Sequence, residues 1–223
     1  MTALLRYQAA LLLRSQRWLP PVILYAAFLA IGVQSGQPVL DSLGYTAAAL
    51  LPVAAWLVRI CATNEPPAAR SCTGAAAGPG RAHLACLLVA FSAAALLGAA
   101  AVLFVTVISA PKSTDHQTRI EAVPAAGAGL LVALVCALLG VAVGTLTNWP
   151  LLRSPGRAVP ALLLGALLTL VLAGSPARAA VTSLVEGSQH ATIPVPVLPL
   201  AAAALLTAAA IAVACALTTR RSP

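Results

Sequence analysis

The sequence predicts an all-α integral membrane protein, with six transmembrane helices preceded by an amphipathic helix on the membrane surface. Of its 223 residues, 61% are hydrophobic and only 8% are charged, whereas soluble domains average roughly 25% charged residues. These charges are too few to cover a soluble globule of this size, so lipid must be the solvent for most of the surface. We expect residues 1–223 to form a single transmembrane domain.

Residues 3–17 are predicted to form the amphipathic interfacial helix. At about 100° per residue, Arg6, Arg14 and Arg17 fall within an arc of about 80°. Four leucines fall on the opposite side: Leu4, Leu5, Leu11 and Leu12. The arginines would face lipid phosphates, the leucines would lie at the boundary of the acyl chains, and Trp18 follows where an aromatic anchor belongs. The alternative is a first span that starts early and carries a long basic flank.

Six apolar segments have the length and polarity of membrane helices, which need about 20 residues. The fifth is short for a full crossing, so we expect it to be thinned, tilted or followed by a re-entrant piece. Gly140 and Gly144 in the fourth segment have the small-xxx-small spacing that lets helices approach closely, either within the subunit or at a dimer seam. The six segments are residues 18–33, 44–62, 83–109, 124–146, 159–174 and 194–217.

The basic residues predict that both termini lie in the cytoplasm. If the N-terminus is inside, the outer segments hold only Lys112, Arg119 and Arg178 of the 13 Lys and Arg residues. The excess of positive charge on the inner side is the one that orients membrane proteins. The heavy use of Ala, Leu, Gly and Pro is typical of GC-rich bacterial genomes such as those of actinobacteria, so we expect a bacterial plasma membrane protein. The inner basic residues are Arg6, Arg14, Arg17, Arg59, Arg70, Arg81, Arg153, Arg157, Arg220 and Arg221.

The loop at residues 63–82, between the second and third spans, carries the main functional signal. It holds Glu65, the only acidic residue on the predicted cytoplasmic side. Pro66 and Pro67 suit the start of a helix, where proline is tolerated, and Glu65 just before them suits the helix dipole. Residues 68–77 have room for about two turns before Gly78 ends them, and Arg81 follows at the mouth of the third span.

In its layout and in this loop the chain resembles the permease subunits of ABC-2-type ABC transporters, which have the six-span fold of type V exporters. Those proteins begin with an interfacial helix and carry a short cytoplasmic coupling helix between their second and third spans. Two prolines directly after the acidic residue depart from the usual pattern, so we expect a shifted or shortened coupling helix. The alternative is an ordinary polar loop. The matching residues are Glu65, Arg70, Ala75, Ala76, Ala77, Gly78, Pro79 and Arg81.

The resemblance implies that Glu65, Arg70 and their neighbours touch a separate ATP-binding subunit, present in two copies, and pass its closure to the spans. A second copy of this chain or a related permease would complete the complex. ATP and Mg would be bound by the partner, and this chain would hold no cofactor. The family also places short re-entrant helices between the fifth and sixth spans, and residues 175–193, on the extracellular side, have the right place and length for them.

The sequence offers no recognisable catalytic motif. The only lysine, Lys112, follows no Gly-rich phosphate-binding loop. His83, His116 and His190 lie at span edges or in outer loops, without the spacing of a metalloprotease or a serine nucleophile at matching depth. The arginines form no basic stripe with interleaved aromatics, which argues against nucleic acid as a partner. We therefore expect no catalytic, cofactor or metal site in this chain.

The function that these features favour is that of a permease subunit in an ATP-driven exporter. The apolar spans suit a hydrophobic or amphipathic cargo, such as a lipid, a drug or a peptide. One alternative is a membrane scaffold or assembly factor. A second is an intramembrane lipid-modifying enzyme, for which Arg153, Arg157 and Asn148 are the only clustered polar candidates. A stable ATP-binding partner would separate the first reading from the other two.

Overall fold

A computed structural model describes the whole chain except residues 115–117, 149–150, 152–153 and 222–223. The described residues form nine α-helices and no β-strand beyond two isolated bridges. The helices are α1 (Thr2–Ser15), α2 (Leu19–Gly32), α3 (Val39–Asn64), α4 (Pro67–Ala77), α5 (Pro79–Ile108), α6 (Ala122–Leu146), α7 (Pro155–Val171), α8 (Pro176–Gln189) and α9 (Val197–Arg221).

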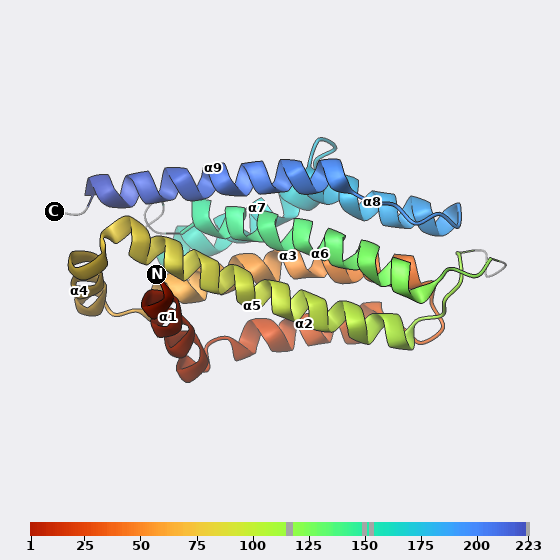
Figure 1. Cartoon of the computed structure of the whole chain (residues 1–223), viewed down its shortest axis with the longest axis horizontal. Helices are drawn as coiled ribbons and strands as arrows, with labels where there is room; N and C mark the ends of the chain where they lie inside the picture. The colour runs from red at the N-terminus through yellow and green to blue at the C-terminus, as the bar shows by residue number, and fades with distance from the viewer. Residues whose placement is uncertain (115–117, 149–150, 152–153, 222–223) are drawn as a thin grey trace.

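The longer helices run side by side in an elongated bundle, and α1 lies across them near one end (Figure 1). We call that end, formed by α1, α4, the start of α5 and the last turns of α9, the terminal end. There the thiol of Cys215 in α9 lies 3.7 Å from the carbonyl oxygen of Gly80 in α5. The opposite end, which we call the loop end, is formed by residues 33–38, 109–114 and 118–121 and by the last turn of α8. There the Val39 N–H donates to the Ala110 carbonyl at 3.1 Å.

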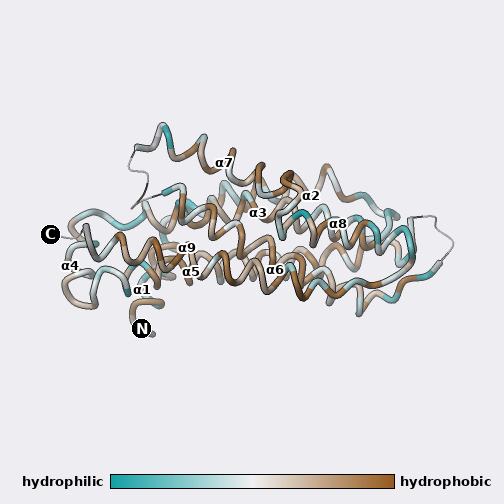
Figure 2. The backbone as a smooth tube through the Cα atoms, turned by 90° about the horizontal axis from the view of Figure 1, so that it is seen from above, coloured by the Kyte–Doolittle hydropathy of each residue, from teal (hydrophilic) through white to brown (hydrophobic). Residues whose placement is uncertain are grey.

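Four helices in the described part of the chain are long and apolar enough to cross a membrane, namely α3, α5, α6 and α9. A fifth crossing is formed if α7 and α8, which meet at a bend of 47°, count as one broken span. Helix α2 has 14 residues and is about 21 Å long, less than the ~30 Å hydrocarbon core. Hydrophobic residues line the helices, and hydrophilic residues gather mainly at the two ends (Figure 2). The chain is a multi-pass membrane protein.

Helix α3 begins at Val39, five residues before the predicted span. Pro38 and contacts with the loop end stabilise its first turn. Pro38 has φ −56° and ψ 134°, so it ends the extended loop and starts the helix. Asp41 then lies in the first turn, where the helix dipole favours a negative charge. Its Oδ2 also accepts a hydrogen bond of 3.1 Å from Thr114 Oγ1. Tertiary contacts at the loop end therefore set this boundary.

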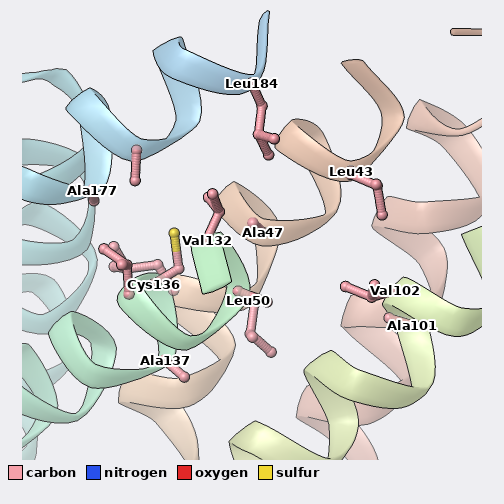
Figure 3. Close-up of a cluster of buried hydrophobic side chains, with 14 of the residues drawn as sticks. Leu43, Ala47, Leu50, Ala101, Val102, Val132, Cys136, Ala137, Ala177 and Leu184 are labelled. Atoms are coloured by element: carbon pink, nitrogen blue, oxygen red, sulfur yellow. The ribbon is translucent and has the colours of Figure 1, made fainter. Parts of the chain in front are cut away.

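Helix α3 is the centre of the bundle and packs against α2, α5, α6, α7 and α8. Figure 3 shows the middle of this core, where side chains from four helices meet. Leu50 of α3, Val102 of α5, Val132 of α6 and Leu184 of α8 are all completely buried. Most of the remaining core side chains are Ala, Val and Leu, so the packing depends on shape rather than on polar contacts.

Helices α3 and α6 make the most extensive contact among the described helices, and two glycines make their close approach possible. A Cβ atom on Gly140 would lie 2.5 Å from the Leu51 carbonyl oxygen of α3. A Cβ atom on Gly144 would lie 2.8 Å from the Ala55 carbonyl oxygen. Both glycines therefore face a neighbouring helix of the same chain, where a side chain has no room.

The break between α7 and α8 has its own polar partners. The Ser175 side chain accepts a hydrogen bond from the Ala177 N–H, which caps the start of α8. Arg178 Nη1 donates to the Val171 carbonyl at the end of α7, at 2.6 Å. Backbone groups at a helix break within a membrane need such partners, because lipid supplies none. The predicted re-entrant segment at residues 175–193 is thus occupied by α8, joined to α7 through a capped bend.

Candidate functional site

The candidate site is centred on Glu65, which follows α3 directly and is only 7% exposed. Its two carboxylate oxygens are bound by different helices. Gln8 Nε2 of α1 donates to Oε2 at 3.2 Å, and Thr73 Oγ1 of α4 donates to Oε1 at 3.0 Å. A buried carboxylate is costly unless hydrogen bonds replace its water. Glu65 therefore joins α1, α3 and α4 at one point.

Two further polar contacts hold the same junction together. Asn64 Nδ2, at the end of α3, donates to the Leu11 carbonyl of α1 at 2.9 Å. Arg70 Nη2 of α4 donates to the Ala62 carbonyl at 2.6 Å and to the Glu65 carbonyl at 3.2 Å. A guanidinium at this place also suits the negative end of the α3 dipole. Helix α4 is thus attached to the end of α3 rather than suspended in a free loop.

Tyr7 adds an electrostatic feature to the junction. Partial desolvation of its ring, followed by the negative charge of Glu65, raises the pKa of Tyr7 above its usual value of 10.0. The phenol is protonated at neutral pH, as an unperturbed tyrosine also is. It adds no second negative charge beside the buried carboxylate.

Prolines and glycines explain why a separate short helix forms here. Pro66 is extended and Pro67 occupies the first turn of α4, where its missing N–H costs nothing. At the other end Gly78 has φ 88° and ψ 136°, a conformation that a residue with a Cβ rarely adopts. Pro79 then opens α5 at once. The two helices are therefore joined by a sharp, single-residue turn.

The outward side of α4 is smooth and uncharged. Its exposed residues recur every three or four positions, so they share one face of the helix. The only charged residue of α4, Arg70, is half-buried and turned toward α3. A surface of small side chains lets another protein approach the helix backbone closely. The exposed residues of α4 are Pro67, Ala68, Ser71, Cys72, Ala75 and Ala76.

The structure brings some of the predicted site residues together and separates others. Glu65 and Arg70 meet at the α3–α4 junction. Ala75 and Ala76 lie on the exposed side of α4, and Gly78 forms the turn that follows it. Arg81 is exposed in the first turn of α5.

Sequence reasoning missed the polar partners of Glu65, namely Gln8 and Thr73. Gln8 leaves a signal, because it is an uncharged polar residue on the same side of α1 as Leu5 and Leu12. A polar residue among leucines indicates a buried hydrogen-bond partner. Thr73 gives no such signal, since threonine is common in exposed loops.

The interfacial helix departs from its prediction on the leucine side. Arg6, Arg14 and Arg17 are exposed as expected. Leu12, however, is only 6% exposed and packs on α3 and α5, with Leu5 beside it. Part of the leucine face thus binds protein instead of the acyl chains that the sequence predicted. Trp18 is half-buried, and its Nε1 lies 3.4 Å from the Leu13 carbonyl oxygen, across the turn between α1 and α2.

The polar residues considered for a lipid-modifying enzyme form a different arrangement. Asn148 is buried at the end of α6, where it accepts a hydrogen bond from Arg59 Nη1 at 3.0 Å and donates to Gly144. Arg157 is exposed at the start of α7, and Arg153 lies outside the described residues. Asn148 is thereby engaged in pairing Arg59. Within the described residues no group of three or more His, Cys, Asp or Glu side chains is placed to hold a metal ion.

Comparison of the chain with protein-family models, with curated proteins and with solved structures gives no match.

Proposed function

We propose that the chain is the transmembrane permease subunit of an ATP-driven exporter of the ABC-2 type. The observation that carries the proposal is the Glu65 junction, which ties a short exposed helix to the central helix of the bundle. Two ATP-binding subunits, which would hold ATP and Mg, would dock on α4 from the cytoplasm. A second copy of this chain, or a related permease, would complete the pathway.

A six-span layout is supported by the positions of the two termini. The start of α1 and the end of α9 both lie at the terminal end, which fits an even number of crossings of the bundle (Figure 1). Helices α3, α5, α6 and α9 and the α7–α8 pair supply five crossings. The sixth then falls to α2. A 14-residue helix can serve if the bilayer thins around it or its flanks extend toward the headgroups.

The junction offers a direct route for movement. When the ATP-binding subunits close, they would push on the uncharged face of α4. Arg70 and Thr73 would carry that displacement to the end of α3 and to Glu65, and Gln8 would carry it on to α1. Helix α3 contacts most of the other helices, so a tilt of α3 would repack the bundle.

The spans also bear on the kind of cargo. Exposed faces of the helices are dominated by Leu, Val and Ala, and most charged side chains lie toward the two ends, with Arg178 at the α7–α8 break as an exception. Such walls suit a hydrophobic or amphipathic molecule, such as a lipid, a drug or a peptide. The energy for moving it would come from the partner.

Affinity capture of the tagged chain from its native membrane in mild detergent tests the proposal. We expect an ATP-binding protein with a phosphate-binding loop, at a fixed ratio to the chain, together with ATP hydrolysis in the captured complex. Ala75→Arg places a charge on the smooth face of α4 and should abolish capture, because an unpaired charge in a protein interface costs several kcal/mol. Ser35→Arg, at an exposed position of the loop end, is the matched control and should not change it.

Capture of the chain alone, under conditions in which neighbouring membrane complexes stay intact, would contradict the proposal. So would an ATP-binding partner that is retained equally by the Ala75→Arg and Ser35→Arg variants, because α4 would then not be its docking site.

A further inference from the structure

An apolar groove separates α2 from α5 in the half of the bundle that leads to the loop end. Its volume is about 430 Å³, and apolar residues and Tyr25 line it. Ala26 and Ala30 of α2 and Ala100 and Phe104 of α5 are exposed along its sides. The groove ends beside Val33 and Ile108, which lie next to the loops.

The groove exists because α2 is fixed to α3 and to the loops rather than packed along α5. The Tyr25 hydroxyl donates to the Thr46 carbonyl of α3 at 3.1 Å. Gly32 lies directly against the ring of Tyr45, so the backbone of α2 packs on this side chain of α3. At the loop end the Ala110 N–H donates to the Gln37 carbonyl at 2.9 Å, which joins the loops that follow α2 and α5. These contacts hold α2 in place beside α3 and leave the groove between α2 and α5 open.

The length and the apolar lining of the groove indicate which molecule it would bind. Its lining covers residues 22–33 on the α2 side and 97–108 on α5, a length of about 17 Å at the rise of a helix. Half of the hydrocarbon core of a bilayer is about 15 Å. The lining is apolar along this whole length, so a single hydrocarbon chain can lie in the groove from the bilayer centre to the loop end.

We propose that this groove binds one acyl chain of a phospholipid from the leaflet at the loop end. The exposed polar residues Gln34 and Ser35 follow directly on Val33, at the level where the headgroup would lie. The acyl chain fills a space between α2 and α5 that would otherwise lack contacts. It therefore stays with the protein longer than lipids on the convex faces of the bundle do. This proposal does not depend on the proposed function.

Labelling with a photoreactive lipid tests the site. The full-length protein is placed in nanodiscs that contain phosphatidylethanolamine with a diazirine halfway along one acyl chain, and the adducts are mapped by mass spectrometry. We expect adducts to concentrate in residues 22–33 and 97–108, and to be rarer on the exposed leucines of α7, such as Leu163 and Leu164. Equal labelling of the two regions would show ordinary bilayer contact and would overturn the proposal.

Paired variants in α2 sharpen the test. Ala26→Phe fills the groove. Labelling of the groove residues by the photoreactive lipid should then fall on the order of tenfold, because displacing about two methylenes from an apolar site costs that much affinity. Ala27→Phe is the control, since Ala27 is exposed on the same helix but does not line the groove. Ala100→Phe fills the groove from α5, on the opposite wall, and should lower the labelling to a similar extent. A distortion of α2 is then excluded as the cause. Unchanged labelling in both groove variants would contradict the proposal, and so would an absence of adducts at residues 22–33 and 97–108, because protein rather than lipid would then cover the groove.

Discussion

Glu65 shows how a single buried carboxylate can define a joint between helices. Each of its carboxylate oxygens accepts a hydrogen bond from a different helix, one from Gln8 of α1 and one from Thr73 of α4. Hydrogen bonds to charged groups contribute about 1.5–3 kcal/mol each, roughly twice as much as neutral ones. Loss of either partner leaves part of a buried charge without compensation. The junction is therefore stable with both partners present and weak with one missing.

Thr73→Val tests this account of the carboxylate. The substitution keeps the shape of the side chain but removes the hydroxyl that donates to Glu65. We expect the free energy of unfolding in nanodiscs to fall by about 1.5–3 kcal/mol. Ser71→Ala is the matched control in the same helix, because the Ser71 hydroxyl is exposed and bonds only to the Pro67 carbonyl. A loss of equal size in both variants would mean that α4 stability, not the carboxylate, is being measured.

The sequence allowed only part of this junction to be predicted. Glu65 is recognisable as an isolated acidic residue in an otherwise basic set of inner loops, and Arg70 as its neighbour on the following segment. That these two meet at one corner depends on how α4 turns back against the end of α3. Gln8 lies 57 positions away from Glu65, so no local pattern connects them. Their role in coupling stays a prediction.

The helices themselves follow from hydrophobicity and from the position of Pro and Gly. The apolar segments that form α3, α5, α6 and α9 are long enough for membrane helices to be predicted from their composition. The boundaries were less predictable, because contacts between distant loops extend α3 and because Gly78 and Pro79 leave almost no loop before α5. Whether the chain has six spans depends on α2 and on the α7–α8 pair, and this too stays a prediction.

Two glycines of α6 allow a matched test of helix packing. Gly140→Ala should lower the free energy of unfolding by about 1–3 kcal/mol, because its Cβ would overlap the α3 backbone. Gly127→Ala, in the same helix, meets nothing within 4 Å and should leave stability unchanged or raise it by up to about 1 kcal/mol through better helix propensity. Thermal unfolding of the two variants in the same detergent compares them. Equal destabilisation would argue that helix α6 does not approach α3 as closely as described.

Taken as one object, the molecule has two ends with different chemistry. The terminal end carries the arginine face of α1, the Glu65 junction and the smooth face of α4. The loop end carries short hydrogen-bonded loops and the last turn of α8. Between them, α3 runs the full length of the core, so a force applied to α4 reaches the membrane interior through one continuous helix. A partner at the terminal end is therefore the requirement on which the transport proposal depends.

Photo-cross-linking from the exposed face of α4 measures whether that partner is there. The photoreactive amino acid p-benzoylphenylalanine replaces Ala68 on α4, and in a parallel sample it replaces Ser35 at the loop end; both positions are exposed. In native membranes we predict a cross-link from position 68 to an ATP-binding protein, with a yield that changes when ATP is added, and none to that protein from position 35. The absence of any ATP-binding protein among the cross-links from position 68, with the chain correctly inserted, would contradict the account.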